Sequence, residues 1–192
     1  MKTKIPFNYI LKFLGIFCVL YFGTQAMIAF SAPGGKMHIP FVEKYLDYVS
    51  WIKLSLIRVP AFILGLFGIA THEEPGFLLR INGGRGVIVA YSCVGYGVYS
   101  FWIAFVAANK GTLRKKILWI VGGVLALWFI NMIRIMLFLV AINKGWPMPL
   151  GLDHHTWFNI VAYLLIFLMI IWYDRSEKNK KAAAIINPVT PK

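Results

Sequence analysis

Three side chains in this sequence could together carry out acyl transfer: Cys93, Arg134 and His155. The thiolate of a cysteine is a strong nucleophile, and a neighbouring histidine can take the thiol proton and later deliver it to a leaving amine. An arginine is permanently charged and can hold a developing oxyanion. These residue types indicate a nucleophile, a general base and acid, and an anion-stabilising group, provided that the fold brings them together.

Each of these residues also has a simpler reading. Cys93 could be a small packing residue, and Arg134 could form a structural ion pair with Asp153. His154 and His155 could be a loop pair or an adventitious metal site. The sequence has neither the Cys/His spacing of a built zinc site nor a His-Glu-x-x-His motif, so neither a metal nor a cofactor is expected.

Two asparagines accompany the charged residues at helical spacing. Asn131 precedes Arg134 by three residues, and Asn159 follows His155 by four, so each pair shares one face of a helix. We expect both amides to orient the site or to form interhelical hydrogen bonds. His154 stays beside His155 as a supporting residue, with His155 preferred as the base.

Composition places these residues in a membrane. The chain has 192 residues, of which 59% are hydrophobic, and its mean hydropathy is +0.70, whereas soluble domains are about 45–50% apolar. This predicts one all-α, polytopic, membrane-embedded domain over residues 1–192. The net charge of +13 lies beside apolar runs, so it indicates membrane topology and lipid partners with anionic headgroups rather than nucleic acid.

About four transmembrane helices are expected from the apolar runs. The first could be mistaken for a signal peptide, but it is longer than a typical apolar signal core. Cys18 lies deep in this run, so a disulfide with Cys93 is not expected. The four runs are Tyr9–Phe30, Val94–Ala108, Ile117–Ile142 and Trp157–Tyr173.

The segment Phe41–Thr71 is apolar but does not read as a simple span. It contains Lys53, Arg58 and Pro60. A charge near the bilayer centre costs at least ~2.5 kcal/mol, and proline removes a helical hydrogen bond. We expect an interfacial or re-entrant helical segment with a break near Pro60.

A small β-hairpin is expected just before Cys93. Two short apolar runs, Phe77–Ile81 and Arg85–Val89, flank the turn sequence Asn-Gly-Gly at residues 82–84. The hairpin would face outward and lead the chain into Ser92 and Cys93.

The positive-inside rule fixes the expected topology. Lys and Arg gather in the N-terminal segment, in the loop Lys110–Lys116 and in a basic tail over residues 176–192, which places both termini in the cytoplasm. Cys93 and His155 then begin spans at their outer ends. Arg134 lies about 17 residues, or about 25 Å, along a span that rises through a core of about 30 Å. The three residues therefore fall at similar depth.

At these positions the sequence resembles the exosortase/archaeosortase family of membrane transpeptidases. Ser92-Cys93-Val94-Gly95 is similar to the family's Cys-Ser-Gly type motif, and residues 131–135 (Asn-Met-Ile-Arg-Ile) are similar to its Asn-x-x-Arg motif. His155 before an aromatic-containing helix start is the third match. The resemblance covers roughly residues 76–173, with Val94 where the family often has a small polar residue and with fewer spans before Cys93 than in larger members. It implies Cys93 as the nucleophile with Arg134 and His155 as partners.

The resemblance also implies the substrates and the location. The partners would be exported proteins with a C-terminal signal made of a recognition motif, a transmembrane helix and a basic cluster. The chain would cleave this signal through a thioacyl intermediate and pass the acyl group to an acceptor, at the bacterial inner membrane with the site facing outward. The alternative is a non-enzymatic membrane subunit of a polysaccharide export or surface assembly complex. A transporter is less favoured because no inverted repeat is visible.

Overall fold

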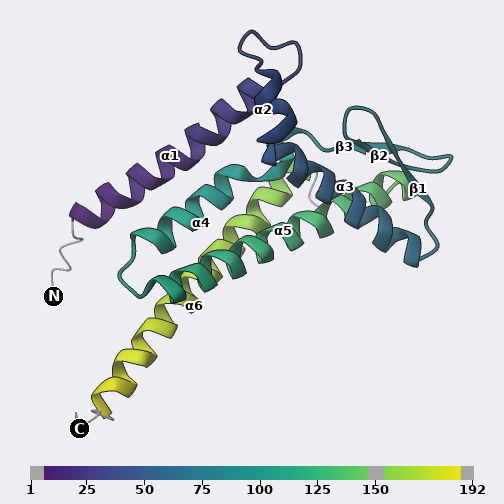
Figure 1. The fold of residues 1–192 in the computed structure, drawn as a ribbon. Coiled ribbons are helices and arrows are strands. Elements are labelled where there is room, and N and C mark those ends of the chain that lie inside the picture. The colour runs from purple at the N-terminus through teal and green to yellow at the C-terminus, as the bar shows by residue number, and fades with distance from the viewer. Residues whose placement is uncertain (1–6, 147–153, 187–192) are drawn as a thin grey trace.

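The chain is a bundle of long helices with a small sheet at one end. A computed structural model describes residues 7–146 and 154–186, and Figure 1 shows their arrangement. In the described part, five helices are long and apolar enough to cross a membrane. Four of them correspond to the predicted spans, and the fold is the expected all-α polytopic one. They are α1 (Phe7–Ser31), α4 (Tyr96–Ala108) together with the turn that precedes it from Tyr91, α5 (Leu113–Lys144) and α6 (His154–Ile186).

The fifth such helix is α3 (Tyr48–Leu66), which follows the short helix α2 (Pro40–Tyr45). Asp47 caps α3 by accepting a hydrogen bond from the Ser50 amide at 3.0 Å. The predicted break near Pro60 is wrong, because α3 continues through Pro60. Proline inside a helix costs about 3 kcal/mol, and here the surrounding packing offsets that cost, since Pro60 is buried and α3 packs on α5.

The direction of α3 differs from that of the other long helices. Figure 1 shows it running obliquely to α1, α4 and α6 and leading away from the bundle toward the sheet. Its length and composition would allow it to span a membrane. The interfacial or re-entrant path expected for this segment stays a prediction.

The predicted hairpin is present and has a third strand. β2 (Leu78–Ile81) pairs antiparallel with β3 (Gly86–Ile88), with Leu79 opposite Val87. β1 (Thr71–Glu74) pairs antiparallel with the other edge of β2, so the strand order is β1-β2-β3. The sequence did not predict β1.

An asparagine near the end of α5 holds the sheet. The Asn143 side chain accepts a hydrogen bond from the Arg85 amide at 2.6 Å and donates one to the Arg85 carbonyl at 3.0 Å. The backbone N–H and C=O groups of Arg85, in the β2–β3 turn, therefore both bind one side-chain amide. This contact fixes the sheet against the helix that carries Arg134.

In the part of the chain that the structure describes, two packed clusters form the interior, and they meet at the segment containing Cys93. One joins α3, the sheet and α5, and it includes Leu79, Ile135 and Cys93. The other joins α4, α5 and α6 around Trp102, and it includes Val94. Consecutive residues thus belong to different clusters, which holds this short segment from both sides.

The last helix extends beyond the predicted span. α6 runs without interruption to Ile186, so the basic segment that begins at residue 176 continues a helix through most of its length. Figure 1 shows the start of α1 and the end of α6 toward one end of the molecule and the sheet toward the other. Large apolar side chains such as Phe22, Leu118 and Phe167 are exposed, as expected for a surface that faces lipid. The chain is a multi-pass membrane protein.

Candidate active site

Cys93 lies in a short 3-10 turn, η1 (Tyr91–Val94), between the sheet and α4. The turn closes through a hydrogen bond from the Cys93 amide to the Ala90 carbonyl at 2.9 Å. Gly95 follows with a φ of +79°, a left-handed conformation that glycine adopts without the steric cost of a side chain. The chain can therefore change direction at Gly95 and begin α4 at Tyr96, three residues after the cysteine.

An asparagine of α5 fixes the backbone of this turn. Asn131 is 1% exposed, and its Nδ2 donates to the carbonyl of Cys93 at 2.6 Å and to the carbonyl of Val94 at 3.3 Å. The expected interhelical hydrogen bond of Asn131 thus goes to the backbone of the cysteine turn itself. Its position and its contacts make it a clamp between α5 and η1.

Cys93 and Arg134 line one cavity. The cavity has a volume of about 290 Å³, and its walls come from the sheet, from η1 and from α5. Cys93 is 6% exposed there, while Arg134 is half-buried one helical turn after Asn131 on the same face of α5. The structure therefore brings together two residues that lie about 40 positions apart in the sequence. The other described residues that line the cavity are Leu78, Gly86, Val87, Ile88, Ala90, Ile135 and Phe138.

For the two histidines, the structure describes the backbone but not the side chains. His154 and His155 are the first two residues of α6, but their side chains lie outside the described part of the chain, as does Asp153. Asn159, about one turn further along α6, is exposed. The roles expected for these four residues stay predictions.

Cys93 supplies a thiol and Arg134 a guanidinium to the walls of this cavity. Cys18 and Cys93 are both free, as expected. Within residues 7–146 and 154–186, no group of three His, Cys, Asp or Glu side chains could hold a metal ion. A thiol nucleophile and an oxyanion-binding cation suit acyl transfer.

A comparison with protein-family models assigns the chain to a family. The model of the transmembrane exosortase family matches residues 6–177. The chain belongs to the transmembrane exosortase family. The match begins well before the residues that first suggested it and includes α1 and α3. Searches of curated proteins and of solved structures found no match.

Family membership supports a membrane-embedded sorting transpeptidase, and the family is generally one of cysteine transpeptidases. In this exosortase, the described cavity contains the cysteine and the arginine that the resemblance singled out.

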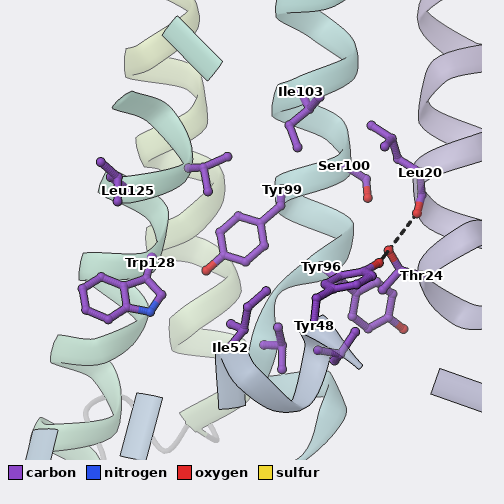
Figure 2. A pocket seen from close by; sticks show the side chains of 13 residues that line it. Leu20, Thr24, Tyr48, Ile52, Tyr96, Tyr99, Ser100, Ile103, Leu125 and Trp128 are labelled. Carbon is purple, nitrogen blue, oxygen red and sulfur yellow. Dashed lines mark hydrogen bonds between the residues drawn. The ribbon is translucent and has the colours of Figure 1, made fainter. Parts of the chain in front are cut away.

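A larger cavity lies on the other side of η1. It has a volume of about 500 Å³ and is mostly apolar. Figure 2 shows Leu20 and Thr24 of α1 on one side of it and Leu125 and Trp128 of α5 on the other, with Tyr99 of α4 between them. Among the described residues that line it there is no cysteine, histidine or charged side chain, so its size does not make it the reactive site.

A buried lysine beside the turn was missed as a site residue. Lys53 of α3 is 4% exposed, and its Nζ lies 3.6 Å from the centre of the Phe77 ring and 4.1 Å from that of Tyr91. In the sequence, Lys53 counted only as an obstacle to a simple span. A lysine within an apolar run is by itself a signal of function or pairing, and that signal could have found it.

Proposed function

We propose that this exosortase-family chain is a cysteine protease and transpeptidase that cleaves the C-terminal sorting signals of exported proteins and transfers them to an acceptor. The observation that supports it most directly is that Cys93 and Arg134, from two distant segments, line one cavity. The Asn131 clamp on the Cys93 carbonyl adds a fixed backbone for the nucleophile. Family membership supplies the reaction class.

In the proposed mechanism, His155 takes the proton from the Cys93 thiol, and the thiolate attacks the scissile carbonyl carbon. The carbonyl oxygen becomes an oxyanion beside the Arg134 guanidinium. The C–N bond then breaks, His155 gives its proton to the leaving amine, and a thioester remains on Cys93. An acceptor nucleophile attacks the thioester, loses its proton to His155 and releases Cys93. With water as the acceptor, the result is proteolysis.

The proposed substrates are exported proteins that end in a recognition motif, a transmembrane helix and a basic cluster. The basic cluster would stay in the cytoplasm beside both termini of the enzyme, at the bacterial inner membrane, while the motif reaches Cys93 on the outer side. The apolar cavity shown in Figure 2 reaches Val94, so apolar side chains of such a helix could pack next to the cysteine turn.

The test uses a reporter that carries the C-terminal segment of an exported protein from the same genome with this tripartite ending. Cells with the wild-type chain should release a shortened reporter, and Cys93→Ala should leave it at full length. Cys18→Ala is the matched control and should cleave normally, since Cys18 lies in α1 away from the cavity. A hydroxylamine-sensitive adduct between enzyme and reporter should form with the wild-type chain and be absent in Cys93→Ala.

The partner residues give a second arm of the same test. Removing one oxyanion-stabilising donor costs ~10²–10³ in rate, so Arg134→Gln should slow cleavage by that factor. His155→Ala should abolish cleavage and His154→Ala should not. Normal processing by a folded Cys93→Ala chain would reject the enzyme proposal and favour a non-enzymatic subunit of an export or assembly complex.

A further inference from the structure

Strand β3 forms one edge of the sheet, and half of its backbone groups face away from β2. The strand order is β1-β2-β3, so β3 has a neighbouring strand on one side. The Val89 amide donates to the Phe77 carbonyl at 2.9 Å, and hydrogen-bonded pairs alternate along an antiparallel ladder, so Val87 also points its backbone groups at β2. The N–H and C=O groups of Gly86 and Ile88 therefore point outward.

These outward groups border the cavity of the cysteine. In the part of the chain that the structure describes, the outward backbone groups of Gly86 and Ile88 have no hydrogen-bond partner. Both residues line the cavity that also contains Cys93 and Arg134. A backbone group that stays unpaired when water leaves costs about as much free energy as a lost hydrogen bond. An occupant that excludes water from this edge must therefore supply donors and acceptors along it, at the spacing of a strand.

The two edges of the sheet differ in charge. The β1 edge contains the charged or titratable residues His72–Glu74, and Glu73 forms an ion pair with Arg58 at 3.6 Å. The β3 edge reads Gly-Val-Ile, with neither a charge nor a proline, and Ile88 is 62% exposed. Proteins protect unused sheet edges with charged side chains or prolines. The β1 edge has this protection and the β3 edge does not, as expected for an edge that pairs with another chain.

The course of β3 along α5 sets the direction of a peptide that pairs with it. Arg85, just before β3, is bound by Asn143, and the carbonyl of Cys93, after β3, is bound by Asn131. These two asparagines are 12 residues apart on α5, which is about 18 Å along a helix. The segment from β3 to η1 thus leads from the sheet end of the molecule back toward the other helices (Figure 1). A substrate whose recognition motif precedes its transmembrane helix must run the same way.

We propose that the recognition motif of the substrate binds as an extended strand parallel to β3. The inference rests on the proposed function and names the part of that site that holds the peptide. In a parallel ladder, one substrate residue opposite Val87 donates its N–H to the Gly86 carbonyl and accepts a hydrogen bond from the Ile88 amide. Backbone pairing of this kind supplies affinity, while alternate side chains of the added strand supply sequence preference. A few residues further along, the peptide reaches Cys93 and Arg134 in the same cavity.

A proline at position 88 tests the backbone contact. Ile88→Pro removes the outward N–H and leaves the β2–β3 ladder intact, because an edge strand tolerates proline where the nitrogen faces away from its neighbour. The assay uses the purified full chain in detergent and the reporter with the tripartite ending. Compared with Ile88→Ala, which keeps the N–H, Ile88→Pro should raise the reporter concentration for half-maximal cleavage about 3- to 10-fold, the value of one net hydrogen bond. The maximal rate should change less.

The opposite edge of the sheet offers a matched proline control. Thr71 is the first residue of β1 and lies opposite Ile81. The next residue, Asn82, donates its amide to the carbonyl of Ala70, so the backbone groups of Thr71 face away from β2. Thr71→Pro therefore makes the same change at the edge that does not border the cavity, and it should leave the half-maximal concentration unchanged.

Disulfide cross-linking tests the strand conformation without cleavage. In a chain with Ile88→Cys, Cys18→Ala and Cys93→Ala, β3 carries the only thiol, because the sequence has two cysteines. Single cysteines are placed in turn along the recognition motif of the reporter, and copper phenanthroline oxidises pairs of close thiols. Successive side chains of a strand point to opposite faces, so cross-links should form at every second motif position.

The outcomes separate this inference from the proposed function. Cross-links at helical spacing, at every position or at none would overturn it, as would a disulfide between two copies of the chain. Equal half-maximal concentrations for Ile88→Pro and Ile88→Ala would overturn it too, and if Ile88→Pro fails to fold, the cross-linking pattern decides. Alternating cross-links to a reporter that the wild-type chain leaves intact reject the proposed function alone. Cleavage that depends on Cys93 without the alternating pattern rejects the role of β3 alone.

Discussion

Replacing Asn131 by alanine should open the cysteine turn. The side-chain amide of Asn131 holds two carbonyl groups of η1, at 2.6 Å from Cys93 and 3.3 Å from Val94, in a position that is 1% exposed. In Asn131→Ala, both carbonyls lose this donor in a place that water reaches poorly.

The structure sets the size of the effect. A buried acceptor left without its donor costs about 1–3 kcal/mol. The bond to Cys93 is short and should count nearly in full, whereas the longer one to Val94 should count for less, which gives a total of about 2–3 kcal/mol. Since about 1.4 kcal/mol corresponds to a factor of ten, the open form of the turn should become about 30- to 150-fold more populated.

The open form can be measured through the thiol. Cys93 is 6% exposed, so a maleimide carried on a rigid dye larger than the 290 Å³ cavity should react only when the turn opens. The labelling rate at a fixed pH, in a Cys18→Ala background, should rise 30- to 150-fold in Asn131→Ala. Asn143→Ala is the control, because Asn143 on the same helix also binds a backbone carbonyl, that of Arg85, but at the sheet.

Two outcomes would refute this reasoning. If Asn131→Ala is labelled within a factor of three of the parent, the amide does not hold the turn. If Asn143→Ala accelerates labelling as much as Asn131→Ala does, the effect belongs to α5 as a whole and not to the hydrogen bonds at Cys93.

Two further predictions concern packing and pH. A Cβ atom on Gly123 would collide with Nε1 of the buried Trp102, so Gly123→Ala should destabilise the bundle by about 1–3 kcal/mol and lower the midpoint of thermal unfolding in detergent. Gly122→Ala, whose Cβ atom would meet no atom within 4 Å, should leave the midpoint unchanged or raise it slightly. A hydrogen bond from Arg80 lowers the pKa of Glu74 from its ordinary 4.5, so this contact should stabilise the sheet above pH 4.5 and lose its contribution as the pH falls below that value. Limited proteolysis of the sheet with pepsin should show an acid-dependent rise that Glu74→Gln removes, and a rise that persists in Glu74→Gln would reject this origin.

The sequence predicted the elements whose signal is local. Apolar runs gave α1, α4, α5 and α6, and the Asn-Gly-Gly turn gave the β2–β3 hairpin. β1 was not predicted, because Thr71–Glu74 is short and charged, and its strand conformation depends on pairing with β2. The continuity of α3 was not predicted, because the helix continues through Pro60 on account of tertiary packing and not of helix propensity.

The candidate site was predictable where depth in a membrane constrained it. Cys93 and Arg134 were expected at similar depth, and they share a cavity. The position of Lys53 beside the cysteine turn was not foreseeable, because the rings that contact it belong to Phe77, with its positive φ, and to Tyr91 of η1, which reach it only in the folded chain. A charged residue within an apolar run indicates that a partner exists in the fold, but the sequence does not identify that partner.

The Asn131 clamp has a consequence for the biosynthesis of the protein. The amide that holds Cys93 is encoded 38 residues after it. At about 5–20 residues per second, Asn131 leaves the ribosome roughly 2–8 s after Cys93, so each new chain carries its cysteine turn without the clamp for that interval. During that interval the thiol lacks the packing of α5, and oxidation follows exposure. The cysteine of this protein should therefore be most vulnerable while the chain is being made, not while it works.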